Sequence, residues 1–66
     1  MKDNELIIND KKYKLVKVLN IDNKNYIAYE DEESIYVNEY IFEDNQMKLN
    51  EISNQEFDKV VKELNL

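Results

Sequence analysis

The sequence predicts a single α+β domain, a bent antiparallel β-meander of about five strands with one C-terminal helix packed on it. Three observations predict this fold. Short runs rich in β-branched and aromatic residues alternate with clusters of Asn and Asp, apolar and polar residues alternate within several of these runs, and the final dozen residues change to helical spacing. A chain of 66 residues suffices for one domain and no more.

Turns are expected at the Asn and Asp clusters, because the chain contains no Gly and no Pro. Asn and Asp are the remaining residues that readily enter left-handed backbone conformations. The clusters lie at 9–12, 22–25, 30–34 and 43–46, a spacing typical of successive hairpins. The strands are therefore predicted at about 5–9, 13–21, 25–30, 34–42 and 46–52.

The second predicted strand contains a break in its alternation. Tyr13 and Leu15 share one face, but the apolar residues then step to Val16 and Val18. In a flat strand this step would place apolar side chains on opposite faces, so a bulge or a sharp coil is expected there. The sheet is predicted to bend strongly at this point.

The last segment predicts an amphipathic helix at about 54–65. Its apolar residues recur at i, i+3, i+4 and i+7 and form one stripe of Phe57, Val60, Val61 and Leu64. Ser53 and Glu56 have the spacing of a capping box, in which each side chain bonds to the backbone amide of the other residue. The stripe needs an apolar partner, and the sheet is the only partner within the chain.

The fourth predicted strand is apolar on both faces. The two sets are Tyr36, Tyr40 and Phe42 on one side and Ile35, Val37 and Ile41 on the other. One helix cannot cover both, so either the bent sheet wraps on itself as a partial barrel or an aromatic face stays open to bind a second copy or another protein. The candidate interaction surface comprises Tyr29, Tyr36, Tyr40 and Phe42.

Catalytic chemistry is not expected. Without His or Cys, a nucleophile would have to be Ser34 or Ser53 with no imidazole base, and Ser53 is already explained as a helix cap. Cation binding at the acidic run 30–33 is a weaker alternative, because EF-hand spacing is absent and a solvated hairpin tip accounts for the run. We predict no enzymatic activity, no cofactor and no metal site.

Fifteen carboxylates against nine lysines give a formal charge of −6. This charge opposes direct binding to nucleic acid and to anionic membranes. No apolar run has the length of a membrane span or a secretory signal, so a cytoplasmic protein is expected. The candidate acidic patch comprises Glu30, Asp31, Glu32, Glu33, Glu43 and Asp44.

Two functions follow from these surfaces. The first is a non-enzymatic adaptor or regulatory domain that binds a protein partner or forms a homo-oligomer, and it should depend on Tyr36 and Tyr40 but hardly on salt. The alternative is an acidic inhibitor of the anti-restriction or anti-CRISPR type, which mimics nucleic acid by presenting carboxylates in place of phosphates. Its binding should depend on the acids at 30–33 and weaken as salt rises.

The order of these features resembles the short acidic YrzB-like domains of unknown function from low-GC Gram-positive bacteria. The resemblance covers nearly the whole chain and is carried by residues 8–16, 22–29, 40–45 and 56–61. It implies hairpins followed by a tail helix, and it assigns no catalytic or binding residue. Turns in that family usually contain a glycine, where this chain has Asn-Asp or Asp-Asn pairs.

Overall fold

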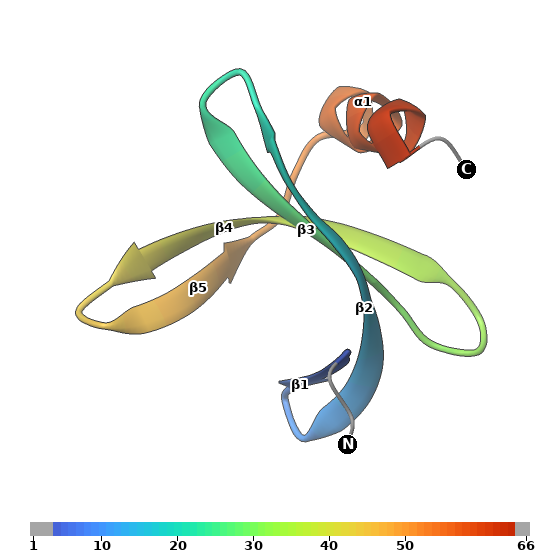
Figure 1. Cartoon of the computed structure of the whole chain (residues 1–66), viewed down its shortest axis with the longest axis vertical. Helices are drawn as coiled ribbons and strands as arrows, with labels where there is room; N and C mark the ends of the chain where they lie inside the picture. Colours follow the sequence, from blue (N-terminus) through green and yellow to red (C-terminus); the bar gives the residue numbers. More distant parts are fainter. Residues whose placement is uncertain (1–3, 65–66) are drawn as a thin grey trace.

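The computed structural model describes residues 4–64 as a five-stranded antiparallel sheet with one helix (Figure 1). The elements are β1 (Glu5–Ile8), β2 (Lys11–Ile21), β3 (Lys24–Glu30), β4 (Ile35–Glu43), β5 (Gln46–Asn50) and α1 (Asn54–Leu64). Every strand pairs with the next one in the sequence, in the order β1-β2-β3-β4-β5. The predicted α+β class and the meander are confirmed.

Three of the four hairpins close with a two-residue turn of Asn and Asp. The pairs Asn9–Asp10, Asp22–Asn23 and Asp44–Asn45 all have positive φ, between 51° and 66°. Left-handed backbone at both central residues is the geometry of a type I′ turn, whose twist matches that of the flanking strands. Because these turns use only two residues, β2 begins at Lys11 and β3 at Lys24, earlier than the predicted residues 13 and 25.

The remaining boundaries differ from the prediction by one or two residues. β1 ends at Ile8, one residue early, and β4 lies one residue later than predicted. β5 ends at Asn50 instead of residue 52, because the chain leaves the sheet there to reach the helix cap at Ser53. The last residue of the predicted helix, Asn65, lies outside the described residues.

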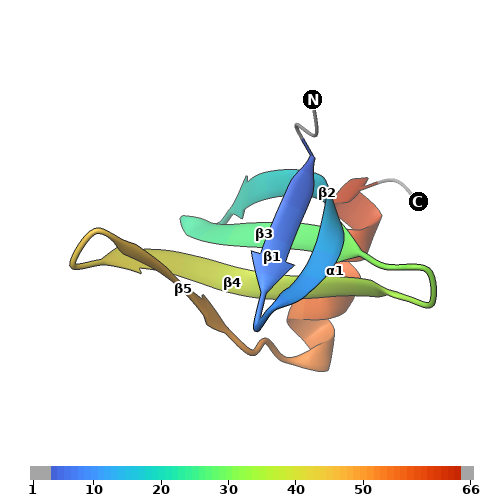
Figure 2. The same ribbon diagram turned by 90° about the horizontal axis from the view of Figure 1, so that it is seen from below.

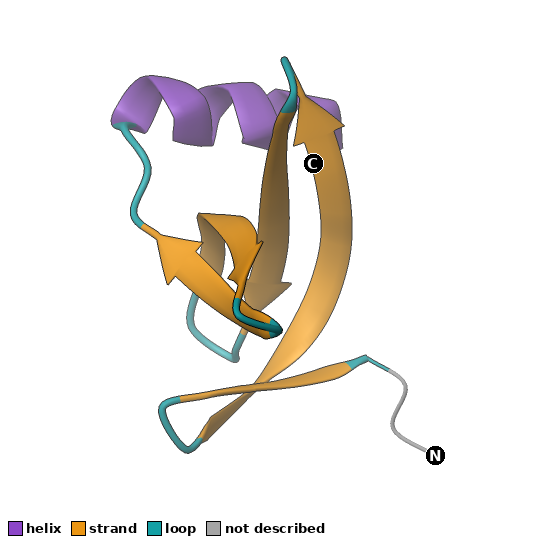
Figure 3. Ribbon diagram, turned by 90° about the vertical axis from the view of Figure 1, so that its left-hand side faces the viewer, coloured by secondary structure: helices purple, strands orange, loops and turns teal. Residues whose placement is uncertain are grey.

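The predicted bulge occurs in β2. Its pairing with β3 shifts between Leu15 and Lys17, so Val16 is the extra residue. Val16 packs against the core, but Val18, which was expected on the same face, is exposed. The extra residue shifts the alternation, and beyond it Leu19 and Ile21 reach the core instead. Figure 3 shows β2 curving along its length.

The core lies between the sheet and α1, which covers one side of the sheet (Figure 2). Its buried members are Tyr26, Ala28, Val37 and Val60, and Val60 is fully buried. Phe57 and Leu64 of the helical stripe pack against this cluster, as does Ile52 just before the helix. The expected packing of the stripe on the sheet is confirmed for Phe57, Val60 and Leu64, whereas Val61 is half-buried and lies outside this cluster.

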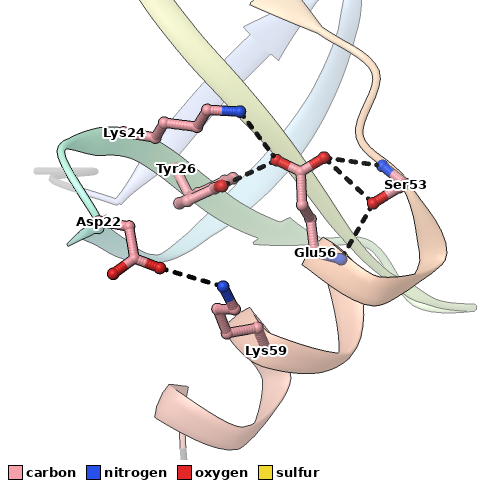
Figure 4. Close-up of polar contacts among 6 residues, drawn as sticks. All are labelled: Asp22, Lys24, Tyr26, Ser53, Glu56 and Lys59. Carbon is pink, nitrogen blue, oxygen red and sulfur yellow. Dashed lines mark hydrogen bonds and ion pairs between the residues drawn. The ribbon is translucent and has the colours of Figure 1, made fainter.

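A network of polar contacts fastens the start of α1 to β3 (Figure 4). Ser53 N donates to Glu56 Oε1 at 3.1 Å and Glu56 N donates to Ser53 Oγ at 3.2 Å, which confirms the predicted capping box. The Tyr26 hydroxyl donates to Glu56 Oε2 at 2.8 Å, and Lys24 Nζ lies 3.6 Å from the same oxygen. Burial, followed by the Glu56 hydrogen bond, raises the pKa of Tyr26 to about 12. Tyr26 therefore remains a donor throughout the physiological range.

Candidate protein-interaction surface

The second half of β4 forms an arm with β5 that extends away from α1 (Figure 1). Pairing between these strands begins at Glu39 and Asn50 and ends at the turn, so we call residues 39–50 the β4–β5 arm. A two-stranded ribbon is only marginally stable in water unless one of its faces is covered. The side chains on the two faces therefore decide what the arm can do.

One face of the arm is apolar. Tyr40 lies opposite Leu49 and Phe42 lies opposite Met47, and alternation along both strands places these four side chains on one side. The Tyr40 and Phe42 rings meet edge to face, with centroids 6.0 Å apart. We call this set of four residues the arm face.

The arm face is open at its tip. Phe42 is 68% exposed and its cross-strand neighbour Met47 is 38% exposed, whereas Tyr40 and Leu49 are half-buried. Single exposed apolar side chains are normal on protein surfaces, but two adjacent ones of this size make the arm face a candidate contact surface.

The opposite face of the arm is polar apart from Ile41, which lies opposite Lys48 and is half-buried. Lys48 Nζ lies 2.9 Å from Glu43 Oε1, and the register places both residues on the side away from Phe42. The arm is therefore an amphipathic ribbon, with an aromatic face and an ion-paired face.

The other two aromatic residues of the predicted surface pack against each other within the domain, where Tyr29 is buried and Tyr36 is half-buried. Tyr29 and Tyr36 stack with centroids 5.5 Å apart, and Tyr13 meets both rings edge to face at 5.0 and 5.6 Å. Tyr29 is 8% exposed, and its hydroxyl donates to Asn38 Oδ1. Burial raises the pKa of Tyr29, and the hydrogen bond to Asp31 is the largest cause of the raised pKa of Tyr36.

The structure thus divides the four predicted residues into two pairs. Tyr40 and Phe42 stay together on the arm, while Tyr29 and Tyr36 belong to a three-ring cluster with Tyr13. Met47 and Leu49 were missed as members of the surface. The alternation of β5 and the Asp-Asn turn before it were sufficient to place them opposite Phe42 and Tyr40.

Asp31 organises the connection between β3 and β4. Its Oδ1 accepts hydrogen bonds from the backbone amides of Glu33 and Ser34, both at 2.9 Å. Its Oδ2 accepts from Lys11 Nζ and from the Tyr36 hydroxyl, both at 3.0 Å. The Lys11 contact is the largest cause that holds the pKa of Asp31 well below its usual range. Asp31 therefore has a structural role in the turn.

We expect Asp31→Ala to speed hydrogen exchange at the amides of Glu33 and Ser34, because both lose their acceptor. Glu32→Ala is the matched control, since it removes a neighbouring exposed carboxylate and leaves Asp31 in place. The exchange rates of these two amides, measured by NMR, should rise about tenfold or more in Asp31→Ala and stay unchanged in Glu32→Ala. Equal exchange in both variants would contradict this role.

The predicted acidic patch forms two separate groups. Glu32 and Glu33 are exposed and Glu30 is half-buried at the β3–β4 turn, whereas Glu43 and Asp44 lie at the far end of β4. Nine strand residues separate the two ends by about 30 Å, and Figure 1 shows the two turns on opposite sides of the molecule. Within residues 4–64, no three acidic side chains gather closely enough to hold a metal ion.

A hollow of about 750 Å³ lies between the β1–β2 hairpin and the β3–β4 turn. Its walls carry charges of both signs, with lysines from β2 facing acids from the turn. The charged lining residues are Glu5, Lys11, Lys12, Lys14, Glu30, Asp31, Glu32 and Glu33. The acids and lysines of this lining lie close enough to pair with one another, as Lys11 does with Asp31, so we place the candidate site on the arm.

Comparison with known proteins adds no relative: no family model, no curated protein and no solved structure matches this chain. The resemblance to the YrzB-like family therefore stays a prediction. In the described part of the chain, no helix combines the length and the apolar character needed to cross a membrane.

Proposed function

We propose that this chain is a non-enzymatic interaction domain that binds a partner protein through the arm face. The observation that carries the proposal is the exposure of Phe42 beside Met47 on a ribbon whose other face is ion-paired. Aromatic residues and Met are enriched in the buried centres of protein interfaces. A partner that covered the arm face would bury these side chains and stabilise the ribbon.

Replacing Phe42 with Ser should abolish partner binding and leave the fold intact. Phe42 is mostly exposed, so the free energy of unfolding should change by no more than about 0.5 kcal/mol. A central aromatic residue of an interface contributes about 2 kcal/mol or more, which corresponds to more than tenfold in affinity. The measurement immobilises the chain and captures proteins from an extract of the cells that naturally express it. The captured proteins are quantified by mass spectrometry.

Ile7→Ser is the matched control. Ile7 is 65% exposed, close to the value for Phe42, but it lies on β1 outside the arm. A protein retained by the parent chain and by Ile7→Ser, and lost with Phe42→Ser, supports the proposal. Identical capture by all three chains contradicts it.

The alternative, mimicry of nucleic acid, has weaker support. Two of the six predicted acids are paired with lysines, Asp31 with Lys11 and Glu43 with Lys48, and the two acidic groups lie at opposite ends of β4. The same capture experiment separates the two functions. A mimic would lose its partner in high salt or when Glu32 and Glu33 become Gln, whereas binding through the arm face should be hardly changed by either.

A further inference from the structure

Half of β4 has an open edge. Its residues 35–39 pair with β3 and its residues 39–43 pair with β5, so only Glu39 has a strand on both sides. β5 ends at Asn50, and the chain then turns away toward the helix cap. Residues 35–38 are therefore left with a single neighbouring strand.

The hydrogen-bond pattern identifies the peptide groups that face this edge. Asp31 N donates to Ser34 O at 3.1 Å, which makes these two residues a hydrogen-bonded pair at the end of the β3–β4 ladder. Such pairs alternate along an antiparallel ladder, so Tyr36 and Asn38 bond to β3. The N–H and C=O groups of Ile35 and Val37 consequently point toward the open edge.

A second wall faces the open edge. A groove of about 360 Å³ is bounded by residues 35–38 on one side and by the β5–α1 connection and the start of α1 on the other. Ile52 and Phe57 make this second wall apolar, and the exposed Glu51 adds a negative charge. Within residues 4–64, the outer edges of β1 and β5 and residues 17–21 of β2, which pair with β3 alone, also lack a second neighbouring strand. Of these edges, the one at 35–38 borders this groove.

We infer that residues 35–38 bind an extended segment of a partner protein, which adds to β4 as a further strand. The unpaired peptide groups of Ile35 and Val37 supply backbone hydrogen bonds that only an extended chain satisfies in series. Alternate side chains of the segment would lie against Ile52 and Phe57, which calls for apolar residues at those positions. Glu51 and the net charge of −6 favour a segment that also carries Lys or Arg.

This inference goes beyond the proposed function, because it concerns a different surface and a different mode of binding. The arm face offers side chains to a folded partner, whereas the edge of β4 offers backbone groups to an extended one. The two surfaces also respond to different substitutions, so one can fail without the other.

The test uses a phage-displayed library of random octapeptides, selected on the immobilised full chain. Selected peptides should alternate apolar residues with others and contain Lys or Arg. When synthetic copies are titrated into ¹⁵N-labelled protein, the amide signals of Ile35 and Val37 should shift, and their hydrogen exchange should slow about tenfold or more.

Ile35→Pro tests the role of the backbone. Proline is tolerated at the first residue of a strand and where the N–H points away from the sheet, so the variant should fold. It lacks the outward N–H and should bind the selected peptides about tenfold more weakly, whereas Ile35→Val keeps the N–H and should bind as the parent does. Phe42→Ser should have no effect on these peptides.

Glu51→Lys provides a second variant that does not alter a strand, because Glu51 is exposed and lies outside β5. It should weaken the binding of basic peptides severalfold. Three results would overturn the inference: no enrichment from the library, peptide-induced shifts confined to other parts of the chain, or protection of Ile35 and Val37 that rises with protein concentration alone. The last result would assign the edge to a second copy.

Discussion

The variant Val60→Asp is expected to be unfolded at neutral pH. Val60 is completely buried where α1 meets the sheet, in contact with the cluster of Tyr26, Ala28 and Val37. A carboxylate at this position would have no partner, and an unpaired buried charge costs several kcal/mol. The core of a chain this small supplies only about 3 to 5 kcal/mol of stability. Circular dichroism should therefore show loss of both helix and strand.

Two further variants make this result specific. Val60→Ala removes apolar volume without adding charge and should lower the free energy of unfolding by about 2 kcal/mol. Gln55→Asp adds the same charge at an exposed position in the first turn of α1, where the helix dipole favours it. A folded Val60→Asp variant with an unchanged midpoint of thermal unfolding would show that α1 does not pack on the sheet through Val60.

Acid should destabilise the domain through Glu56. The hydrogen bond from the Ser53 amide, followed by that from the Tyr26 hydroxyl, lowers the pKa of Glu56 from its ordinary value of 4.5 to about 2. As the pH falls, the unfolded state takes up a proton at this carboxyl before the folded state does. The stabilisation is therefore complete above about pH 4.5 and is lost progressively between pH 4.5 and 2. Asp31, whose pKa is also lowered, acts in the same direction.

Urea unfolding at pH 7 and pH 3 measures this effect. Glu56→Gln cannot titrate and keeps one oxygen acceptor in place of the two that receive the Ser53 amide and the Tyr26 hydroxyl. It should therefore be less stable than the parent chain at pH 7 but lose less stability between the two pH values. Glu63→Gln is the control, because Glu63 is exposed in the last turn of α1 and lies outside the capping network. This variant should lose as much stability between pH 7 and pH 3 as the parent chain does. Equal losses in all three chains would contradict the role of Glu56.

The turns and the helix start were predictable because they depend on neighbouring residues. Asn-Asp and Asp-Asn pairs adopt left-handed backbone at low cost, and in a chain without Gly they indicate where the hairpins close. The capping box depends on Ser53 and Glu56, three residues apart. Boundaries were less accurate, because the length of each turn decides where its strands begin and a cluster of turn residues does not show that length.

The candidate site was predicted only in part. The two apolar faces of β4 were visible in the sequence, and Tyr40 and Phe42 remain together on the arm. The sequence left open whether the sheet would cover the tyrosines, and the structure divides them. Tyr13, Tyr29 and Tyr36 are brought together by the register of β2, β3 and β4, while the arm extends beyond the reach of the other strands.

The sequence by itself determined the order of the elements, the position of the turns, the bulge in β2 and the amphipathic helix, since each of these depends on backbone preferences and side-chain spacing within a few residues. Only the tertiary structure decided that the acids form two groups, that Phe42 is open while Tyr29 is covered, and that residues 35–38 have a free edge. The physical reason is that offsets in strand pairing and the twist between strands accumulate across the sheet. A pattern among a few neighbouring residues does not determine these accumulated offsets and twists.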